Sequence, residues 1–258
     1  MSSVPSQQPL TKPQSSPPAQ AAQTQSNDEK IQAEINKTAQ ATINWDKSST
    51  SGIKVQIILI DRGTLKGQPK VNYRLKVAGA PSDKLYTLVA WPVTFQSPVD
   101  VMDGLAVSRD GTVSCPADST KSCAAQFKGN ELHIILAPEI GEIFRFALVS
   151  EDRQARAFFS VVPAPMIQPD KACSLEAVRL SPHFELVLIR GRGFKPGEDV
   201  SIHTQSYQDA HNVPMKADAQ GEFNLSITPF VKGRTTGIID ITAKAAGCAP
   251  TISFNWGL

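Results

Sequence analysis

The sequence predicts an all-β protein with two tandem antiparallel β-sandwich domains that follow a disordered arm. Three observations support this prediction. Nineteen prolines and sixteen glycines among 258 residues disfavour a bundle of helices. Beyond residue 50, short segments alternate apolar and polar side chains with the two-residue period of a half-buried strand. Turn residues separate these segments at regular intervals, as they do in an antiparallel sandwich.

Length and composition set limits on function. A chain of 258 residues suits one large domain or two of ordinary size, and 41% hydrophobic residues are enough for a core. The formal net charge of +2 is too even a balance for a nucleic-acid binder. No apolar run approaches the roughly 18 residues that a membrane span needs. We therefore expect neither a nucleic-acid partner nor a transmembrane segment.

The first 48 residues differ in composition from the rest of the chain. From Ser2 to Ser26, serine, glutamine, proline and alanine dominate, and Lys12 carries the only charge. Such a segment buries too little apolar area to offset the ordering entropy of about 1–2 kcal/mol per residue. Residues 1–48 are therefore expected to form a disordered arm. Within it, the helical spacing of apolar side chains over 28–42 indicates either a short helix or a partly helical disordered segment.

The start of the chain bears on the cellular compartment. It lacks the basic region and apolar core of a signal peptide. Either the protein is cytoplasmic, or a leader was removed and this chain begins just after the cut. The Pro/Gln/Ser-rich arm and the even number of cysteines favour the second interpretation, which predicts a periplasmic, cell-surface or secreted protein.

Residues 49–164 are expected to form the first sandwich. Residues 71–77 alternate most cleanly, and the segment Arg109-Asp110-Gly111 has the composition of a tight hairpin turn. No segment between residues 52 and 163 convincingly predicts a helix. The expected strands cover residues 54–60, 71–77, 85–91, 105–107, 132–136, 143–149 and 155–162.

A second sandwich is expected over residues 165–258. Two prolines in Pro163-Ala164-Pro165 remove two ladder donors, so a strand should end there and a domain boundary is expected. The remaining ninety or so residues are enough for one more sandwich. The expected strands cover residues 173–180, 184–189, 200–205, 222–228, 238–244 and 251–256.

Two segments of the second domain carry a family resemblance. Residues 191–200, Gly-Arg-Gly-Phe-Lys-Pro-Gly-Glu-Asp-Val, resemble a G-x-G-F-x-P-G-E-x-V segment of bacterial surface immunoglobulin-like modules of the IPT/Big type. Asp218 to Phe223 is similar to the D-x-x-G-x-F hairpin that follows in those modules. The resemblance covers about residues 172–258 and implies an immunoglobulin-like fold for them. It implies almost nothing about activity, because such sandwiches host unrelated functions.

Four cysteines are the strongest chemical signal. Cys115 and Cys123 are close enough in sequence to close a loop of the first domain. Cys173 and Cys248 lie near the two ends of the second domain, which a disulfide would tie together. Zinc binding is the alternative, but the spacings are not those of zinc motifs. We therefore expect the pairs Cys115–Cys123 and Cys173–Cys248, and no metal site.

Catalytic motifs are missing from the sequence, and neither an enzyme activity nor a cofactor is expected. His203 and His211 with Asp209 are the nearest approach to a metal or acid–base cluster. His203 is expected to face solvent and His211 to lie in a polar loop. Asp100 and Asp103, near an expected loop, are too few ligands for calcium.

Aromatic residues suggest one further type of binding surface. An exposed aromatic platform could stack on a carbohydrate, although strand aromatics more commonly pack in cores. Of the candidates, only Tyr207 is expected to be exposed. The aromatic residues considered are Tyr73, Tyr86, Trp91, Tyr207 and Trp256.

Together these features predict a non-catalytic, exported bacterial protein that binds a protein or a glycan at the cell envelope. It would act through surface loops or an open sheet edge. Two alternatives remain open at this point. The chain could be an accessory subunit of an envelope enzyme or secretion assembly, or the first domain could hold an unrecognised hydrolytic site.

Overall fold

The computed structural model describes residues 48–94 and 97–257. Apart from Ser48, the expected arm and the helix expected over 28–42 lie outside the described residues. The described part is nearly all β, and its paired strands are antiparallel. Its named helical elements, α2 (Ala124–Phe127) and η2 (Pro182–Phe184), are short. No helix within the described residues is long and apolar enough to cross a membrane.

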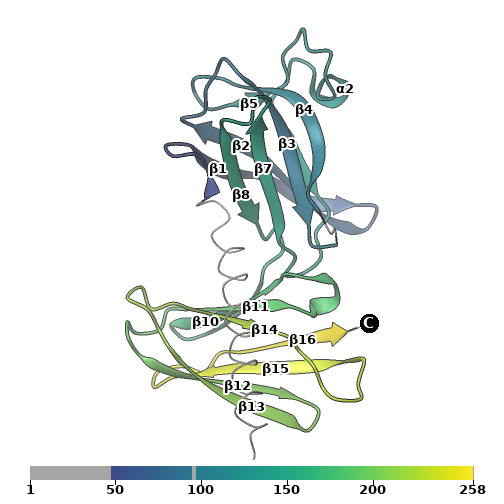
Figure 1. Ribbon diagram of the computed structural model, residues 1–258. Coiled ribbons are helices and arrows are strands. Elements are labelled where there is room, and N and C mark those ends of the chain that lie inside the picture. The colour runs from purple at the N-terminus through teal and green to yellow at the C-terminus, as the bar shows by residue number, and fades with distance from the viewer. Residues whose placement is uncertain (1–47, 95–96, 258) are drawn as a thin grey trace, which may run out of the picture.

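The N-terminal sandwich consists of two facing sheets (Figure 1). One sheet has the order β1-β2-β6 and the other the order β5-β4-β3-β7-β8. The strands are β1 (Lys54–Leu65), β2 (Gln68–Ala78), β3 (Leu85–Pro92), β4 (Val99–Val107), β5 (Val113–Ser114), β6 (His133–Leu136), β7 (Phe144–Ser150) and β8 (Arg156–Val161).

The C-terminal sandwich lies below it in Figure 1 and has two four-stranded sheets. Their orders are β14-β11-β10-β9 and β13-β12-β15-β16. The strands are β9 (Met166–Asp170), β10 (Cys173–Arg179), β11 (Val187–Arg192), β12 (Asp199–Ser206), β13 (Asp209–Lys216), β14 (Phe223–Ile227), β15 (Thr236–Lys244) and β16 (Thr251–Gly257).

The two sandwiches share one order of connections. In the C-terminal sandwich, β10, β11 and β14 take the places that β1, β2 and β6 have in the N-terminal one. Likewise β12, β13, β15 and β16 correspond to β3, β4, β7 and β8. Only β5 and β9 lack a counterpart, and each lies at a sheet edge. The same seven-strand arrangement is therefore built twice.

Each sandwich encloses its own apolar core. Tyr86, Leu105 and Leu148 are fully buried in the N-terminal core, and Ile202 and Ile241 in the C-terminal one. In β3 and in the first half of β12, which supply Tyr86 and Ile202, buried and more exposed side chains alternate, so the period of two places the buried set between the sheets. Each fully buried side chain of this size stabilises the fold by about 1.5–3 kcal/mol.

The residues that carry the family resemblance have defined structural roles. Phe194 and Phe223 are both buried, and their ring centroids lie 5.3 Å apart. Gly191 lies against Phe223, where a Cβ atom would approach a ring carbon to 2.0 Å. Gly221 has φ +73°, and the carboxylate of Asp218 accepts hydrogen bonds from the backbone of the same turn. The two segments thus close one end of the C-terminal core.

A third, smaller cluster joins the two sandwiches. Val93 and Ile143 of the N-terminal sandwich pack with Val178 and Leu188, which lie on the outer face of the sheet that contains β10 and β11. This face is covered rather than solvated, which explains why β10 is buried along nearly its whole length. The two sandwiches therefore meet through a packed apolar contact.

Charged groups border this contact. The side chain of Arg179 is 7% exposed, and its guanidinium pairs with the carboxylates of Glu139 and Glu142. The Arg179 backbone N–H also donates to the carbonyl of Gly141, at 2.7 Å. Burial raises the pKa of Glu142, and the Glu139 backbone N–H and the Arg179 charge oppose that rise. The junction therefore contains a buried ion pair as well as apolar side chains.

Several sequence-based expectations about strands were wrong. A strand, β9, follows directly after Pro163-Ala164-Pro165, where none was expected. β13 was missed as well, and it occupies the region in which His211 was expected to lie in a loop. Both are edge strands with mostly exposed side chains, so neither shows the apolar alternation that predicts a strand.

Two local assignments also differ from expectation. The strand expected over 184–189 begins at Val187, because residues before it form η2. The ring of Phe184 stacks on that of Phe254 at 4.9 Å, so this apolar residue packs from a helical turn instead of a strand. In the N-terminal sandwich, α2 is a single helical turn where no helix was expected, and it is too short to have a periodic pattern.

Candidate functional site

The cysteines form two disulfides. All four lie in the described part of the chain, and the bonds join Cys115 to Cys123 and Cys173 to Cys248, the pairs that the sequence favours. Their Cα atoms are 5.6 and 6.1 Å apart. No free thiol remains among them, so none is available as a zinc ligand.

The histidine–aspartate group does not form a cluster of titratable side chains. His203 lies on β12, and its Nδ1 is 3.0 Å from Oδ1 of Asn212 on the neighbouring strand. His211 is exposed on β13, which corrects the expectation of a polar loop. Within residues 48–94 and 97–257, no three His, Cys, Asp or Glu side chains gather closely enough to hold a metal ion.

The aspartates considered for calcium have other surroundings than expected. Asp100 and Asp103 both lie on β4, which begins at Val99 and so extends further toward the N-terminus than the strand expected over 105–107. The carboxylate of Asp103 accepts a hydrogen bond from the backbone N–H of Ser122, at 2.7 Å. Hydrogen bonding with Ser122 lowers the pKa of Asp103. This aspartate therefore holds the disulfide loop against β4.

An aromatic platform is not formed by the residues considered for it. Three of them are buried in the cores, namely Tyr73, Tyr86 and Trp256. Trp91 lies under the guanidinium of Arg145, at 4.4 Å. Tyr207 is 49% exposed, as expected, and Arg234 covers its ring at 4.8 Å. These five residues therefore provide no set of adjacent exposed rings on which a carbohydrate could stack.

A groove between two edge strands is the main candidate site, and the sequence did not reveal it. It has a volume of about 530 Å³ and lies between β13 and β14, where the two sheets of the C-terminal sandwich separate. Alternate residues of β13 line it, because strand side chains point to one face with a period of two. Val213 and Met215 of β13 face Leu225 and Ile227 of β14.

The polar side of the groove is small. Asp209 and His211 extend the β13 row at one end, and Thr204 and Ser206 contribute hydroxyl groups from β12. The apolar side continues beyond β14 into Phe230, which is 69% exposed. An aromatic ring so exposed beside an apolar groove is a feature of interaction surfaces.

β13 also offers a free backbone edge. Its only partner within the described residues is β12, because β13 ends the order β13-β12-β15-β16. Pro214 has no N–H, and proline within a strand is confined to positions whose N–H would point away from the sheet. Since alternate residues orient their backbone groups alike, Ala210 and Asn212 also direct theirs to the free edge. Unpaired donors and acceptors thus lie beside the apolar groove.

Comparison with known proteins gives no further guidance. No model of a protein family matches the chain, and no curated protein matches it.

Proposed function

We propose that this protein is an exported, non-catalytic binding protein of the bacterial cell envelope, and that it holds an extended segment of a partner protein in the β13–β14 groove. One observation carries the proposal: the free edge of β13 lies directly beside an apolar groove that continues into the exposed Phe230. A bound strand would use both features at once.

The binding mode follows from the edge and the groove. A strand added to β13 would form backbone hydrogen bonds at Ala210 and Asn212, each with a net contribution of about 0.5–1.5 kcal/mol. Its alternate side chains would enter the groove between Val213 and Leu225. Backbone bonds would supply affinity, and the fit of the side chains would supply specificity. Burial of Phe230 would add about 1.5–3 kcal/mol.

A protein partner is better supported than a glycan. The groove has apolar walls and a strand edge, and both match an extended peptide. The aromatic residues considered for stacking on sugars are buried or covered by arginine side chains. This contrast favours the protein half of the sequence-based expectation.

The disulfides support export. Structural disulfides persist in oxidising compartments and are rare in a reducing cytosol. Blocking thiols in intact cells before lysis tests this part of the proposal. The account predicts that all four cysteines escape alkylation, and alkylation of the four in cells would place the protein in a reducing compartment.

Photo-crosslinking in cells tests the groove. A photoreactive residue at Asn212, on the free edge of β13, should give an adduct of one defined mass. The Phe230→Asp substitution should abolish this adduct, because a charge replaces the apolar contact. The matched control is Asn255, another exposed asparagine on the opposite edge strand of the same sheet. Equal adducts from both positions, no adduct from Asn212, or an adduct that survives Phe230→Asp would each contradict the proposal.

A further inference from the structure

A second groove lies where the two sandwiches meet. Its volume is about 870 Å³, which is within the range of small-molecule sites, and such sites often lie between domains. Val55 and Ile57 of β1 and Val161 of β8 line it from the N-terminal sandwich. Ile167 of β9 lines it from the C-terminal sandwich and is 44% exposed. Apolar side chains of both sandwiches therefore border the same space.

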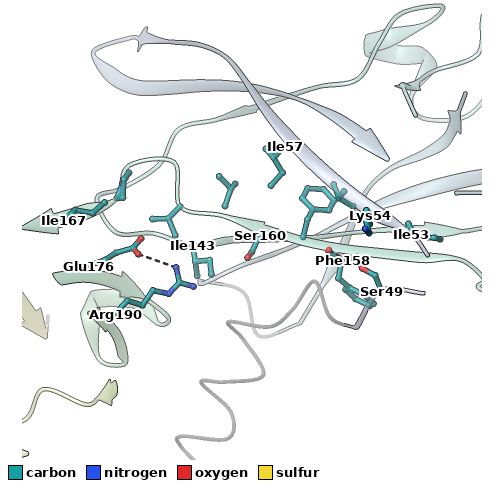
Figure 2. A pocket seen from close by; sticks show the side chains of 15 residues that line it. Ser49, Ile53, Lys54, Ile57, Ile143, Phe158, Ser160, Ile167, Glu176 and Arg190 are labelled. Carbon is teal, nitrogen blue, oxygen red and sulfur yellow. Dashed lines mark hydrogen bonds and ion pairs between the residues drawn. The ribbon is translucent and has the colours of Figure 1, made fainter. Parts of the chain in front are cut away.

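One end of this groove is polar because of the pairing of β9, β10 and β11. Val178 and Leu188, on the outer face of this sheet, pack into the junction between the sandwiches. Glu176 and Arg190 are each two residues away on the same strands, so their side chains point to the same face. Glu176 pairs with Arg190 of β11 on one side and with Ile167 of β9 on the other. These three side chains therefore form one row at the end of the groove (Figure 2).

The charged side chains of the groove favour an anionic ligand. The side chain of Glu176 is only 10% exposed, and its carboxylate is 3.4 Å from Nη1 of Arg190 and 3.9 Å from Nη2 of Arg192. A guanidinium has five N–H donors, and the contact with Glu176 uses one of those of Arg190. Lys54 lies at the opposite end in Figure 2, and no ion pair within the described part of the chain includes it. Two cations and one anion therefore line the groove, which leaves it with an excess of positive charge.

We infer that this groove binds a single-chain amphiphile with a carboxylate head, such as a fatty acid. The remaining N–H donors of Arg190 match the two oxygens of a carboxylate, and the acyl chain would lie along Ile143, Val161 and Ile57. A monoanionic carboxylate suits this end better than a phosphate dianion, because Glu176 already neutralises part of the positive charge. The site shares no lining residue with the β13–β14 groove, so it does not depend on the proposed function.

Calorimetric titration of the full chain with dodecanoate, below its micellar concentration, tests this inference. We expect one bound dodecanoate per chain. Decanoate, which is two methylenes shorter, should bind about tenfold more weakly, because less apolar area is buried. Dodecyltrimethylammonium has the same chain and a cationic head, and should also bind at least tenfold more weakly than dodecanoate. Equal binding of the two head groups, or no binding of dodecanoate below its micellar concentration, would overturn the inference.

A pair of variants tests the contact with the head group. Glu176→Gln removes the carboxylate that competes for Arg190, so dodecanoate should bind to it at least as tightly as to the wild type. The double variant Glu176→Gln/Arg190→Gln differs from it only by the guanidinium, and should bind dodecanoate at least tenfold more weakly. Both variants lack the Glu176 charge, so neither leaves that buried carboxylate without its cation. Equal affinity of the two variants would contradict the role of Arg190.

A further substitution tests the location of the site. Ile167→Asp puts a negative charge into the groove and should abolish dodecanoate binding. Ile238→Asp is the matched control, since Ile238 is also exposed and apolar but does not line this groove, and its affinity should equal that of the wild type. Unchanged binding in Ile167→Asp would place the ligand elsewhere and refute the inference. Light scattering that shows a dimer of the wild type and a monomer of Ile167→Asp would also refute it, because a second copy would then occupy the groove.

Discussion

The two sandwiches differ most in the chain that crosses from one sheet to the other after β4 or β13. Residues 108–132 make this connection in the N-terminal sandwich, and only residues 217–222 make it in the C-terminal one. The longer connection forms β5, the Cys115–Cys123 disulfide and α2. Cys115, Cys123 and Phe127 from this connection pack against the core. The shorter one turns directly into β14, and the space between β13 and β14 stays open as a groove.

In the N-terminal sandwich, backbone hydrogen bonds fix the longer connection in the space between the two sheets. The Val77 N–H of β2 donates to the carbonyl of Gly111, and within the connection the Leu132 N–H donates to the carbonyl of Val113, both at 2.8 Å. Val113 itself pairs with Val107 of β4, so the connection is bonded to strands of both sheets. The same strand order is therefore compatible with either a closed core or an open groove between the sheets, and the two sandwiches differ there in the length of one connection.

The largest expected effect is a difference between the two disulfides in the unfolding free energy that each contributes. Replacing both Cys173 and Cys248 by alanine frees a loop of 75 residues and should cost up to about 4.5 kcal/mol of unfolding free energy. Replacing Cys115 and Cys123 frees only 8 residues and should cost about 2.5 kcal/mol. Urea unfolding of both double variants measures the difference. A greater loss from the pair with the short loop would contradict the loop-entropy account.

The next effect concerns the junction between the sandwiches. Arg179→Met leaves the buried carboxylate of Glu142 without its cation, which should cost about 3 kcal/mol. It should also separate the unfolding of the two sandwiches into two transitions. Calorimetry of the wild type and the variant measures both effects. A single transition at an unchanged temperature would show that the ion pair does not couple the sandwiches.

The same variant carries a pH signature. Burial already places the folded-state pKa of Glu142 above its unfolded value, so the folded state binds more protons. That group's contribution to stability is therefore greatest below the unfolded pKa and falls as pH rises through the folded pKa. Without Arg179 the folded pKa should rise further. Arg179→Met should then lose more stability at neutral pH than at acid pH, and an equal loss at both would refute this explanation.

Two phenylalanine substitutions, one in the longer connection and one beside the β13–β14 groove, sharpen the comparison of the two sandwiches. Phe127→Ala removes a ring that packs on the N-terminal core and should cost about 2 kcal/mol. Phe230→Ala removes a ring that is mostly exposed, so the unfolding free energy should change by no more than about 0.5 kcal/mol. Denaturant unfolding distinguishes the two. Equal costs would mean that Phe230 is part of the core and not of a binding surface.

The smallest effect arises at a turn of the N-terminal sandwich. Hydrogen bonds from Lys84, Ser150 and Gln154 lower the pKa of Asp152 to about 2. Its contribution to stability is present above the unfolded pKa of about 3.9 and is lost as pH falls toward 2. Asp152→Asn should therefore flatten the acid side of the stability profile slightly. Thermal unfolding across that range tests this, with Asp118→Asn, an exposed aspartate, as the control.

Much of the fold could be predicted because its central strands follow simple rules. Residues 71–77 and 251–256 alternate cleanly, since one face of each strand packs on a core and the other meets solvent. The disulfide pairs could be predicted because Cys115 and Cys123 are close in sequence, and because Cys173 and Cys248 lie near the two ends of the second domain. These features depend on local pattern, which a single sequence records.

The candidate site could not be predicted, because it depends on an edge strand and side chains that do not pack in a core. β13 is an exposed edge strand with a proline at Pro214, so its residues resemble a loop. The groove exists only because β13 and β14 end their sheets side by side, which is a property of the topology. Phe230 carries no signal of its own in the sequence. The pairing of Arg179 with Glu142 is likewise a contact between distant segments.

Amide hydrogen exchange in the free protein tests the central comparison most directly. The Leu132 amide, which donates a hydrogen bond to the Val113 carbonyl within the longer connection, should be strongly protected. The Asn212 amide, on the free edge of β13, should exchange at nearly the rate of an unstructured chain. Protection of Asn212 equal to that of Leu132 would contradict the account, because the edge beside the groove would then already be covered.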